Sequence, residues 1–378
     1  RLCPILVYEG SSINSHRECR KVFMKLSLVK KVRFFPAVVI CSLAMLGCGS
    51  LPLDAANQAV STETAVVVKG LDTSLFKAGA FSQPPEIVDC TTTAGTKTSC
   101  YQLVSAGGPA GREPGQFCPR NITDGAAASG AWFSKDGNGD LVDLTGKFIV
   151  NLATYYDDPN WKLYDPKTGK VRYTSTKAAC LGAARPDVEE QYKQNCIECE
   201  MSYLDEGFSR TYLIPVKPIA ATKAERARTV GIALDGAELS GSAPIDAILS
   251  SYTIAAFDDC GGHINEHQGY HYHSSTGCTD KPIGSDGYAP LVGYAADGYG
   301  IYAMKDAAGK EAEALDECRG TSDAVRGYHY RAASPSENMM IGCLHGEVPL
   351  SAGGADIGPP QGGGGRPPPA GHAQTNKR

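Results

Sequence analysis

The sequence lacks a continuous apolar stretch long enough to cross a bilayer as a helix, which takes roughly 20 residues. The longest mostly apolar stretch, over residues 34–46, has 13 residues. The Gly-x-Ser-x-Gly, P-loop and His-Glu-x-x-His motifs are also missing, so the common hydrolase and nucleotide-binding classes are without their signatures. Positive charge is not in excess either, because the formal net charge is −5, and this argues against nucleic acid as the main partner.

The composition suits a folded globular protein. The chain has 378 residues, of which 42% are hydrophobic and 20% charged, and it is long enough for two domains of ordinary size. A core of that size is stable without covalent cross-links, so we interpret the cysteine content as a sign of compartment rather than of a small fold.

The first part of the chain is predicted to be a targeting signal. We interpret residues 1–23 as upstream sequence that is not part of the native protein, which then starts at Met24. Residues 24–47 combine basic residues with the apolar stretch, as a signal peptide does. The segment is followed by Cys48 in a Met-Leu-Gly-Cys context that resembles the lipobox of bacterial lipoproteins. We therefore expect lipidation at Cys48; an ordinary secretory signal with a chance cysteine is the alternative.

These signals predict an exported protein of the bacterial cell envelope, anchored to the membrane through lipid and facing the periplasm or the cell surface. Residues 48–80 are predicted to be a tether, and the Gly- and Pro-rich residues 351–378 a disordered tail. Between them we expect an N-terminal Cys-containing β-rich region over 81–215 and a second domain over 216–350. The sequence indicates no particular protein partner.

Ten cysteines follow the expected lipidation site, and an even number in an exported chain indicates disulfides. Cys90 and Cys100 end and begin two strand-like stretches, which predicts a hairpin closed by this pair. The Cys196-Ile-Glu-Cys199 spacing is not accompanied by a second such pair, so separate structural disulfides are favoured over a zinc or redox motif. The sequence leaves open how these residues pair: Cys118, Cys180, Cys196 and Cys199.

Strand and turn signals dominate after residue 81. Residues 210–216 are predicted to form a strand, and residues 177–201 are the one predicted helical region. Asp136-Gly-Asn-Gly-Asp140 resembles the start of a calcium-binding loop, but Lys147 stands where such a loop needs glutamate, so we predict a solvated turn.

A duplicated unit is the most informative feature of the sequence. Residues 258–263 (DDCGGH) and 269–273 (GYHYH) match residues 316–321 (DECRGT) and 327–331 (GYHYR) at an offset of 58. We predict two related units, at about 231–278 and 293–343, with one disulfide each, Cys260–Cys278 and Cys318–Cys343. The expected fold is mainly β (β-rich α+β), with the two β units related by a pseudo-two-fold repeat and an added N-terminal disulfide-bonded β region.

Residues of about 210–348 resemble the YHYH domain. The resemblance rests on the motif at Tyr270–His273 and on three further segments: Cys-Gly-Gly-His ending at His263, Asp-Glu-Cys ending at Cys318 and Ile-Gly-Cys ending at Cys343. The resemblance covers over a third of the chain and implies no particular activity. The second copy departs from the first at Thr321, which replaces His263, and at Arg331, which replaces His273.

The first copy is a candidate metal site because four histidines fall within eleven residues: His263, His267, His271 and His273. On a strand, His271 and His273 share one face, so they can chelate one ion that His263 completes from the preceding loop. His267 is a possible fourth ligand. Imidazole suits transition metals, and we expect Cu or Zn. The candidates for a supporting role around the ligands are Asp258, Asp259, Glu266, Tyr270 and Tyr272.

A purely structural role is the competing interpretation. Tyrosine favours strands, and the histidines can bond to backbone, Asp258 or Asp259. The second copy keeps His329 without its histidine neighbours, so part of the motif is expected to be structural in both copies. We predict that Arg331 supplies a fixed positive charge there, paired with Asp316 or Glu317.

Three functions therefore stay open. The first is a lipoprotein that binds a transition metal through the first His cluster. The second is a metal-dependent hydrolase or oxidase, since three histidines leave a position for water. The third is a structural or adhesive cell-envelope protein without a metal.

Overall fold

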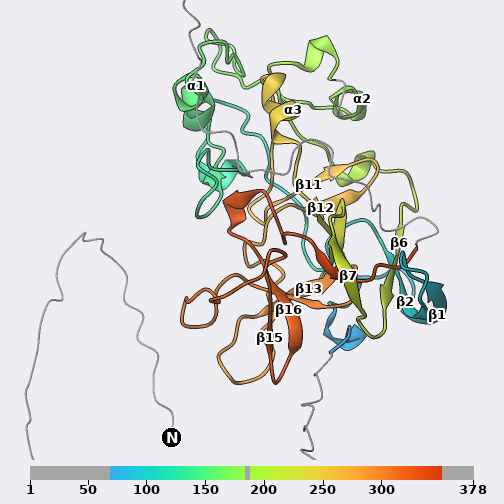
Figure 1. Ribbon diagram of the computed structural model, residues 1–378. Coiled ribbons are helices and arrows are strands. Elements are labelled where there is room, and N and C mark those ends of the chain that lie inside the picture. The colour runs from blue at the N-terminus through green and yellow to red at the C-terminus, as the bar shows by residue number, and fades with distance from the viewer. Residues whose placement is uncertain (1–68, 184–187, 351–378) are drawn as a thin grey trace, which may run out of the picture. The chain divides into compact units, whose positions relative to one another are not determined.

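An eight-stranded sheet is the largest element of the computed structural model, which describes residues 69–183 and 188–350 (Figure 1). Its central strands, β8 (Thr229–Ala233) and β13 (Leu291–Ala295), are buried along their whole length. Their Val, Ile, Leu and Tyr residues suit a sheet covered on both faces. The strand order is β11–β12–β9–β8–β13–β14–β16–β15, with β11 Gly262–Asn265, β12 Gly269–Tyr272, β9 Glu238–Ser240, β14 Gly300–Tyr302, β16 Gly327–Arg331 and β15 Gly320–Asp323.

The two halves of this sheet are related by a pseudo-two-fold axis between β8 and β13. Ile232 pairs with Tyr294 at the axis, and Gly231 pairs with Ala295. In each half the Tyr-His-Tyr strand, β12 or β16, runs parallel to its inner neighbour and antiparallel to the outer strand. A Cβ atom on Gly231 would lie 2.1 Å from the carbonyl oxygen of Tyr294, so the close approach at the axis requires glycine. The predicted mainly β fold is confirmed.

Smaller sheets complete the strand structure of the described residues. The hairpin predicted around Cys90 and Cys100 is confirmed, and so is the strand predicted over 210–216. One sheet consists of β1 (Glu86–Thr91), β2 (Lys97–Ser105) and β6 (Arg210–Pro215); the two-stranded sheets are β3 (Ala131–Trp132) with β4 (Val142–Asp143), β5 (Cys196–Ile197) with β10 (Ile254–Ala255), and β7 (Ala220–Glu225) with β17 (Leu344–Gly346).

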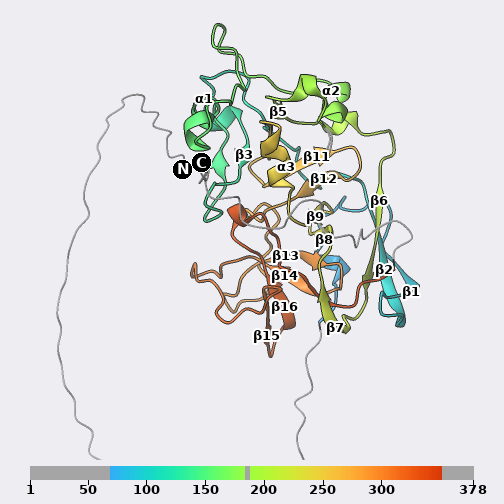
Figure 2. The same ribbon diagram turned by 45° about the horizontal axis from the view of Figure 1, so that its top comes forward.

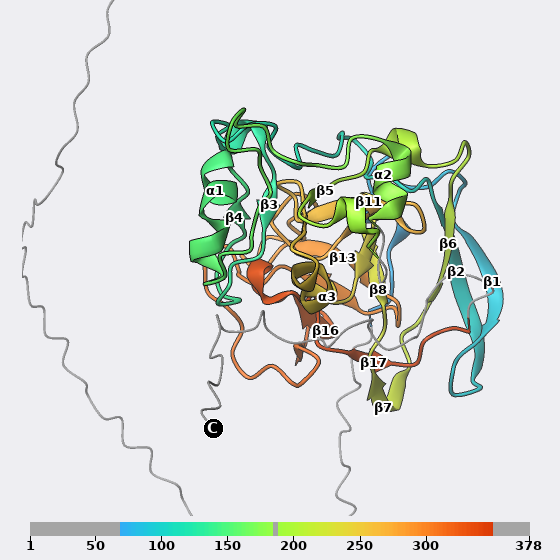
Figure 3. The ribbon, with the colours of Figure 1, turned by 90° about the horizontal axis from the view of Figure 1, so that it is seen from above.

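The α-helices of the described residues lie toward the end of the large sheet that carries β11 and β12 (Figure 2). They are α1 (Gly146–Tyr155), α2 (Lys177–Gly182) and α3 (Ile245–Ser250). Helix α1 begins after Thr145, whose side chain accepts a hydrogen bond from the Phe148 amide. Seen from above, α1 and the β1–β2 hairpin lie on opposite sides of the sheet (Figure 3).

The helix predicted over 177–201 is correct only for α2. Residues 190–192 and 201–203 form single 3-10 turns, and Cys196 lies in β5. Disulfides Cys118–Cys196 and Cys180–Cys199 fix this segment to its neighbours, and the tertiary constraint outweighs local helix propensity.

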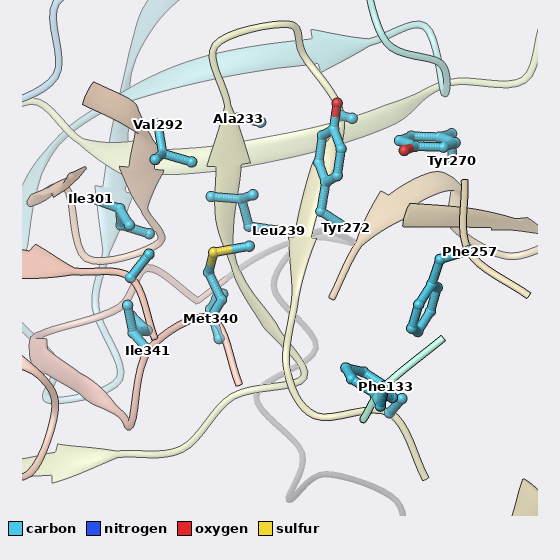
Figure 4. Packing of buried hydrophobic residues seen from close by; sticks show 14 of the residues in the cluster. Phe133, Ala233, Leu239, Phe257, Tyr270, Tyr272, Val292, Ile301, Met340 and Ile341 are labelled. Atoms are coloured by element: carbon cyan, nitrogen blue, oxygen red, sulfur yellow. The ribbon is translucent and has the colours of Figure 1, made fainter. Parts of the chain in front are cut away.

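One continuous apolar core joins the N-terminal region to the large sheet. Trp132 and Phe133 pack on Phe257, with ring centroids 5.4 Å and 4.8 Å away. Figure 4 shows Phe133 and Phe257 side by side at one end of this core and Val292 and Ile301 at the other. Because Phe257 precedes β11, this aromatic cluster supports the hairpin that carries the histidines.

The predicted signal peptide, the lipidation site at Cys48 and the predicted tail lie outside the described residues. Residues 69–80, the end of the predicted tether, pack against the fold, since Leu71 and Ala80 are buried. Among the helices of residues 69–183 and 188–350, none is long and apolar enough to cross a membrane.

Candidate metal centre

The β11–β12 hairpin places the three candidate ligands. His263 lies directly opposite His271 in the antiparallel register, and His273 follows on the same face, two residues beyond His271. The disulfide Cys260–Cys278 joins the segments that enter and leave the hairpin, with a Cα–Cα distance of 5.5 Å. This bridge and the short hairpin turn hold the ligands close together, which lowers the entropy cost of assembling them.

The imidazoles of His263, His271 and His273 converge as the sequence predicted. One ring nitrogen from each lies within 4.8 Å of the other two, and the ring centroids are 4.6 to 5.1 Å apart. Tetrahedral zinc with Zn–N bonds of 2.0–2.1 Å holds its ligand nitrogens about 3.3 Å apart. Side-chain rotations that move each nitrogen by about 1 Å would therefore bring the cluster into that range.

Two of the rings are oriented by main-chain oxygens. The Nδ1 atom of His271 lies 3.1 Å from the carbonyl oxygen of Gly269, and that of His273 lies 2.7 Å from the carbonyl oxygen of Gly241. Since a carbonyl only accepts, Nδ1 carries the proton in both rings and Nε2 keeps its lone pair. Histidines that bind metals are commonly fixed in this way.

Burial keeps these two rings neutral. It lowers the pKa of His271 to about 4 and, together with the neighbouring His271, lowers the pKa of His273 to about 3. A neutral imidazole is the form that binds a metal ion, so the two rings are ready for ligation at neutral pH without losing a proton first.

Acid is expected to destabilise the metal-free protein. An unfolded histidine has a pKa near 6.5, so below that pH the unfolded chain binds more protons than the folded chain, and stability falls until the folded pKa is reached. Between pH 7 and pH 5 the free energy of unfolding should fall by about 2 kcal/mol for each of the two residues. Urea unfolding at both pH values measures this; a His273→Asn variant with an equal pH dependence would contradict the assignment.

The opposite face of β12 carries a polar network of two tyrosine hydroxyls, two carboxylates and Arg112. Tyr270 donates to Asp258 at 2.8 Å and Tyr272 donates to Asp235 at 2.6 Å. Arg112 donates to both tyrosine hydroxyls and to Asp258 at 2.5 to 2.9 Å. The predicted alternation of His and Tyr faces is therefore confirmed, and Asp258 supports the tyrosines rather than the histidines.

The other predicted site residues lie apart from the three-histidine group. The side chain of His267 is 77% exposed and pairs with Glu266 at 3.3 Å, at the tip of the hairpin. Asp259 is exposed, and local desolvation together with the adjacent Asp258 raises its pKa. Neither His267 nor Asp259 belongs to the metal-type group found in the described residues.

A cavity of about 520 Å³ opens over the three histidines. Its walls combine apolar side chains, including Ile248 and Ile264, with Arg210, Gln268 and other polar residues. The site is therefore concave and has room for a small ligand beside the imidazoles.

Glu238 is a functional candidate that the sequence reasoning missed. It is 1% exposed, pairs with His271 across β9 and β12, and accepts hydrogen bonds from Tyr212, Thr229 and Gln268. The repeat contained a signal for Glu238. The offset of 62 residues that relates β8 to β13 aligns Glu238 of the first copy with Gly300 of the second, so the carboxylate is not shared by the two copies. A buried carboxylate in only one copy indicates a role specific to the first half.

The second half repeats the framework but not the ligands. Thr321 pairs with His329 as His263 pairs with His271. The Nδ1 atom of His329 lies 2.9 Å from the Gly327 carbonyl, and its Nε2 faces the Tyr288 hydroxyl. The predicted pairing of Arg331 with Asp316 or Glu317 is wrong: Arg331 donates to two carbonyls, whereas Asp316 binds Tyr328 on the other face.

The disulfide predictions are confirmed for all three predicted pairs. The pairing that the sequence left open is Cys118–Cys196 and Cys180–Cys199. All ten cysteines of the described residues are therefore bonded, and none offers a thiolate to a metal ion or a substrate.

Comparison with known proteins agrees with the resemblance seen in the sequence. A family model described as YHYH protein matches residues 211–357, which include the eight-stranded sheet and both Tyr-His-Tyr strands. Neither the curated proteins nor the solved structures yielded a match.

Proposed function

We propose that this chain, whose residues 211–357 belong to the YHYH family, is a transition-metal-binding protein that holds one ion with His263, His271 and His273. The observation that supports it is the convergence of three imidazole nitrogens within 4.8 Å, two of them from rings that a carbonyl oxygen holds through Nδ1. A purely structural histidine cluster does not need a nitrogen from each of the three rings to lie this close to the other two.

The donor set points to Cu or Zn. It consists of three imidazoles, two of them kept neutral by burial, without a carboxylate or thiolate in the group, and among divalent ions Cu binds most tightly to such nitrogen sites. Hard ions such as Ca and Mg prefer oxygen ligands and are disfavoured here.

Elemental analysis of disulfide-intact protein, dialysed against Cu or Zn, tests the proposal. The unmodified protein should hold one ion per chain, and the His271→Ala/His273→Ala variant fewer than about 0.1, because removing two of three ligands abolishes tight binding. His267→Ala is the matched control from the same hairpin and should keep one ion. Equal stoichiometry in the double variant would contradict the proposal.

A metal-dependent hydrolase is the second candidate, because the cavity over the histidines is open to a small molecule. Three protein ligands leave a position at which zinc lowers the pKa of water. The test is ester hydrolysis by the zinc-loaded protein. Activity that persists after chelation and in the His271→Ala variant would rule out a metal-dependent hydrolase. An oxidase with a tyrosine at the metal is not favoured, since the Tyr270 and Tyr272 hydroxyls lie on the opposite face.

Export and lipid anchoring complete the proposal. The five disulfides among the described residues are typical of a protein folded in an oxidising compartment, and Cys48 follows a lipobox-like segment. In a bacterial host, the full chain should appear in the membrane fraction and a Cys48→Ala variant should not. A variant that stays membrane-bound would contradict lipidation at this residue.

A further inference from the structure

The second half of the sheet contains a pocket in the position that corresponds to the proposed metal site. It has a volume of about 330 Å³ and is lined by Thr321, His329 and Arg331, the residues that correspond to His263, His271 and His273. This second pocket is independent of the metal site, because no lining residue is shared between the two.

Arg331 is a buried positive charge without a carboxylate partner. Its side chain is among the largest fully buried ones, at 2% exposure for the residue, and no carboxylate of residues 69–183 or 188–350 forms an ion pair with it. Nε and Nη2 donate to the carbonyls of Ala303 and Met304 at 2.8 and 2.7 Å. Burying an unpaired ion is costly, and carbonyl dipoles offset only part of that cost.

Arg331 and Thr321 each leave a hydrogen-bond donor unused within the described part of the chain. Arg331 Nη1 makes no hydrogen bond there, and neither does the Thr321 hydroxyl, while both residues line the pocket. His329 offers nothing further, because Nδ1 is bound to Gly327 and Nε2 accepts from Tyr288. The free Nη1 group of Arg331 and the hydroxyl of Thr321 together suit a carboxylate.

The rim of the second pocket restricts the charge of such a ligand. Asp306, Glu311, Glu313 and Asp323 line it. The last three pair with Arg319, Lys310 and Arg326, respectively, whereas Asp306 forms no ion pair within the described residues and accepts hydrogen bonds from backbone amides. The rim therefore carries one carboxylate that no cation neutralises, which disfavours a multiply charged anion such as phosphate.

We propose that the second pocket binds a small monocarboxylate, held by the Arg331 guanidinium and the Thr321 hydroxyl. The volume admits an organic acid of a few carbon atoms, and the Tyr288 ring, 5.0 Å from the Arg331 guanidinium carbon, supplies an apolar wall. The carboxylate provides the negative charge that the protein itself does not place beside Arg331.

Equilibrium dialysis of the metal-free, disulfide-intact full chain with labelled acetate tests this assignment. Acetate should bind saturably at one site, and phosphate should not displace it at equal concentration. Arg331→Lys keeps the charge but loses the planar fork and should weaken binding roughly 30-fold. Thr321→Val, which preserves shape, should weaken binding roughly tenfold.

His267→Ala, at the exposed tip of the hairpin in the other half, is the control and should leave acetate binding unchanged. If Arg331→Lys does not fold, the isosteric Thr321→Val decides. Absence of saturable acetate binding, unchanged affinity in Thr321→Val, or tighter binding of phosphate than of acetate would each overturn the proposal.

Discussion

Replacing Thr321 and Arg331 with histidine, and Tyr288 with phenylalanine, is expected to raise the metal content of the protein from one ion to two per chain. The first two substitutions recreate the ligand set of the first half at positions with the same strand register. The third removes the hydroxyl that faces His329 Nε2, so that this nitrogen regains a free lone pair. His329 Nδ1 already donates to a carbonyl, as His271 Nδ1 does.

The variant Tyr288→Phe alone is the control for this gain and should keep one ion, because a single histidine does not hold a transition metal tightly. Elemental analysis after dialysis against Zn gives the stoichiometry. One ion in the triple variant, with its fold intact by circular dichroism, would mean that the register of the two halves does not place the side chains equivalently.

Replacing Arg112 with methionine is expected to lower the free energy of unfolding by about 3–5 kcal/mol, the usual effect of removing one partner of a buried ion pair. Asp258 is only 1% exposed in its side chain and would lose its cation. The hydroxyls of Tyr270 and Tyr272 would each lose a donor as well. Urea unfolding at pH 7 measures the change.

Lys177→Met supplies the comparison, since Lys177 pairs with Asp205 at a similar distance of 3.1 Å but on the surface, where the Asp205 side chain is 91% exposed. Such exposed pairs contribute little to stability. If Arg112→Met and Lys177→Met were equally stable, the network behind β12 would not be what holds the Tyr-His-Tyr strand in place.

The sequence predicted those parts of the site that depend on local geometry. Alternation along a strand separated His271 and His273 from Tyr270 and Tyr272, and the repeat indicated one disulfide for each unit. Both features follow from chain periodicity and internal comparison, and neither needs knowledge of which distant segments meet.

What the sequence could not predict depends on distant segments. Arg112 lies 146 residues before Asp258, in a Gly- and Pro-rich stretch with no pattern of its own. The role of Glu238 depends on hydrogen bonds from Tyr212, Thr229 and Gln268, which lie beside it only in the folded chain. Helix propensity over 177–201 misled for the same reason, because the bridge between Cys118 and Cys196 joins residues 78 positions apart.

The edge strands of the large sheet, β11 and β15, have four residues each. Each edge strand begins just after a disulfide-bonded cysteine, Cys260 or Cys318. A sheet margin with unpaired amides is a template on which other chains can add strands and aggregate. Short edge strands that a disulfide holds at one end offer few free amides to which another chain could add a strand. Thiol reduction would loosen both margins at once, so a reducing environment would promote self-association before it unfolds the interior.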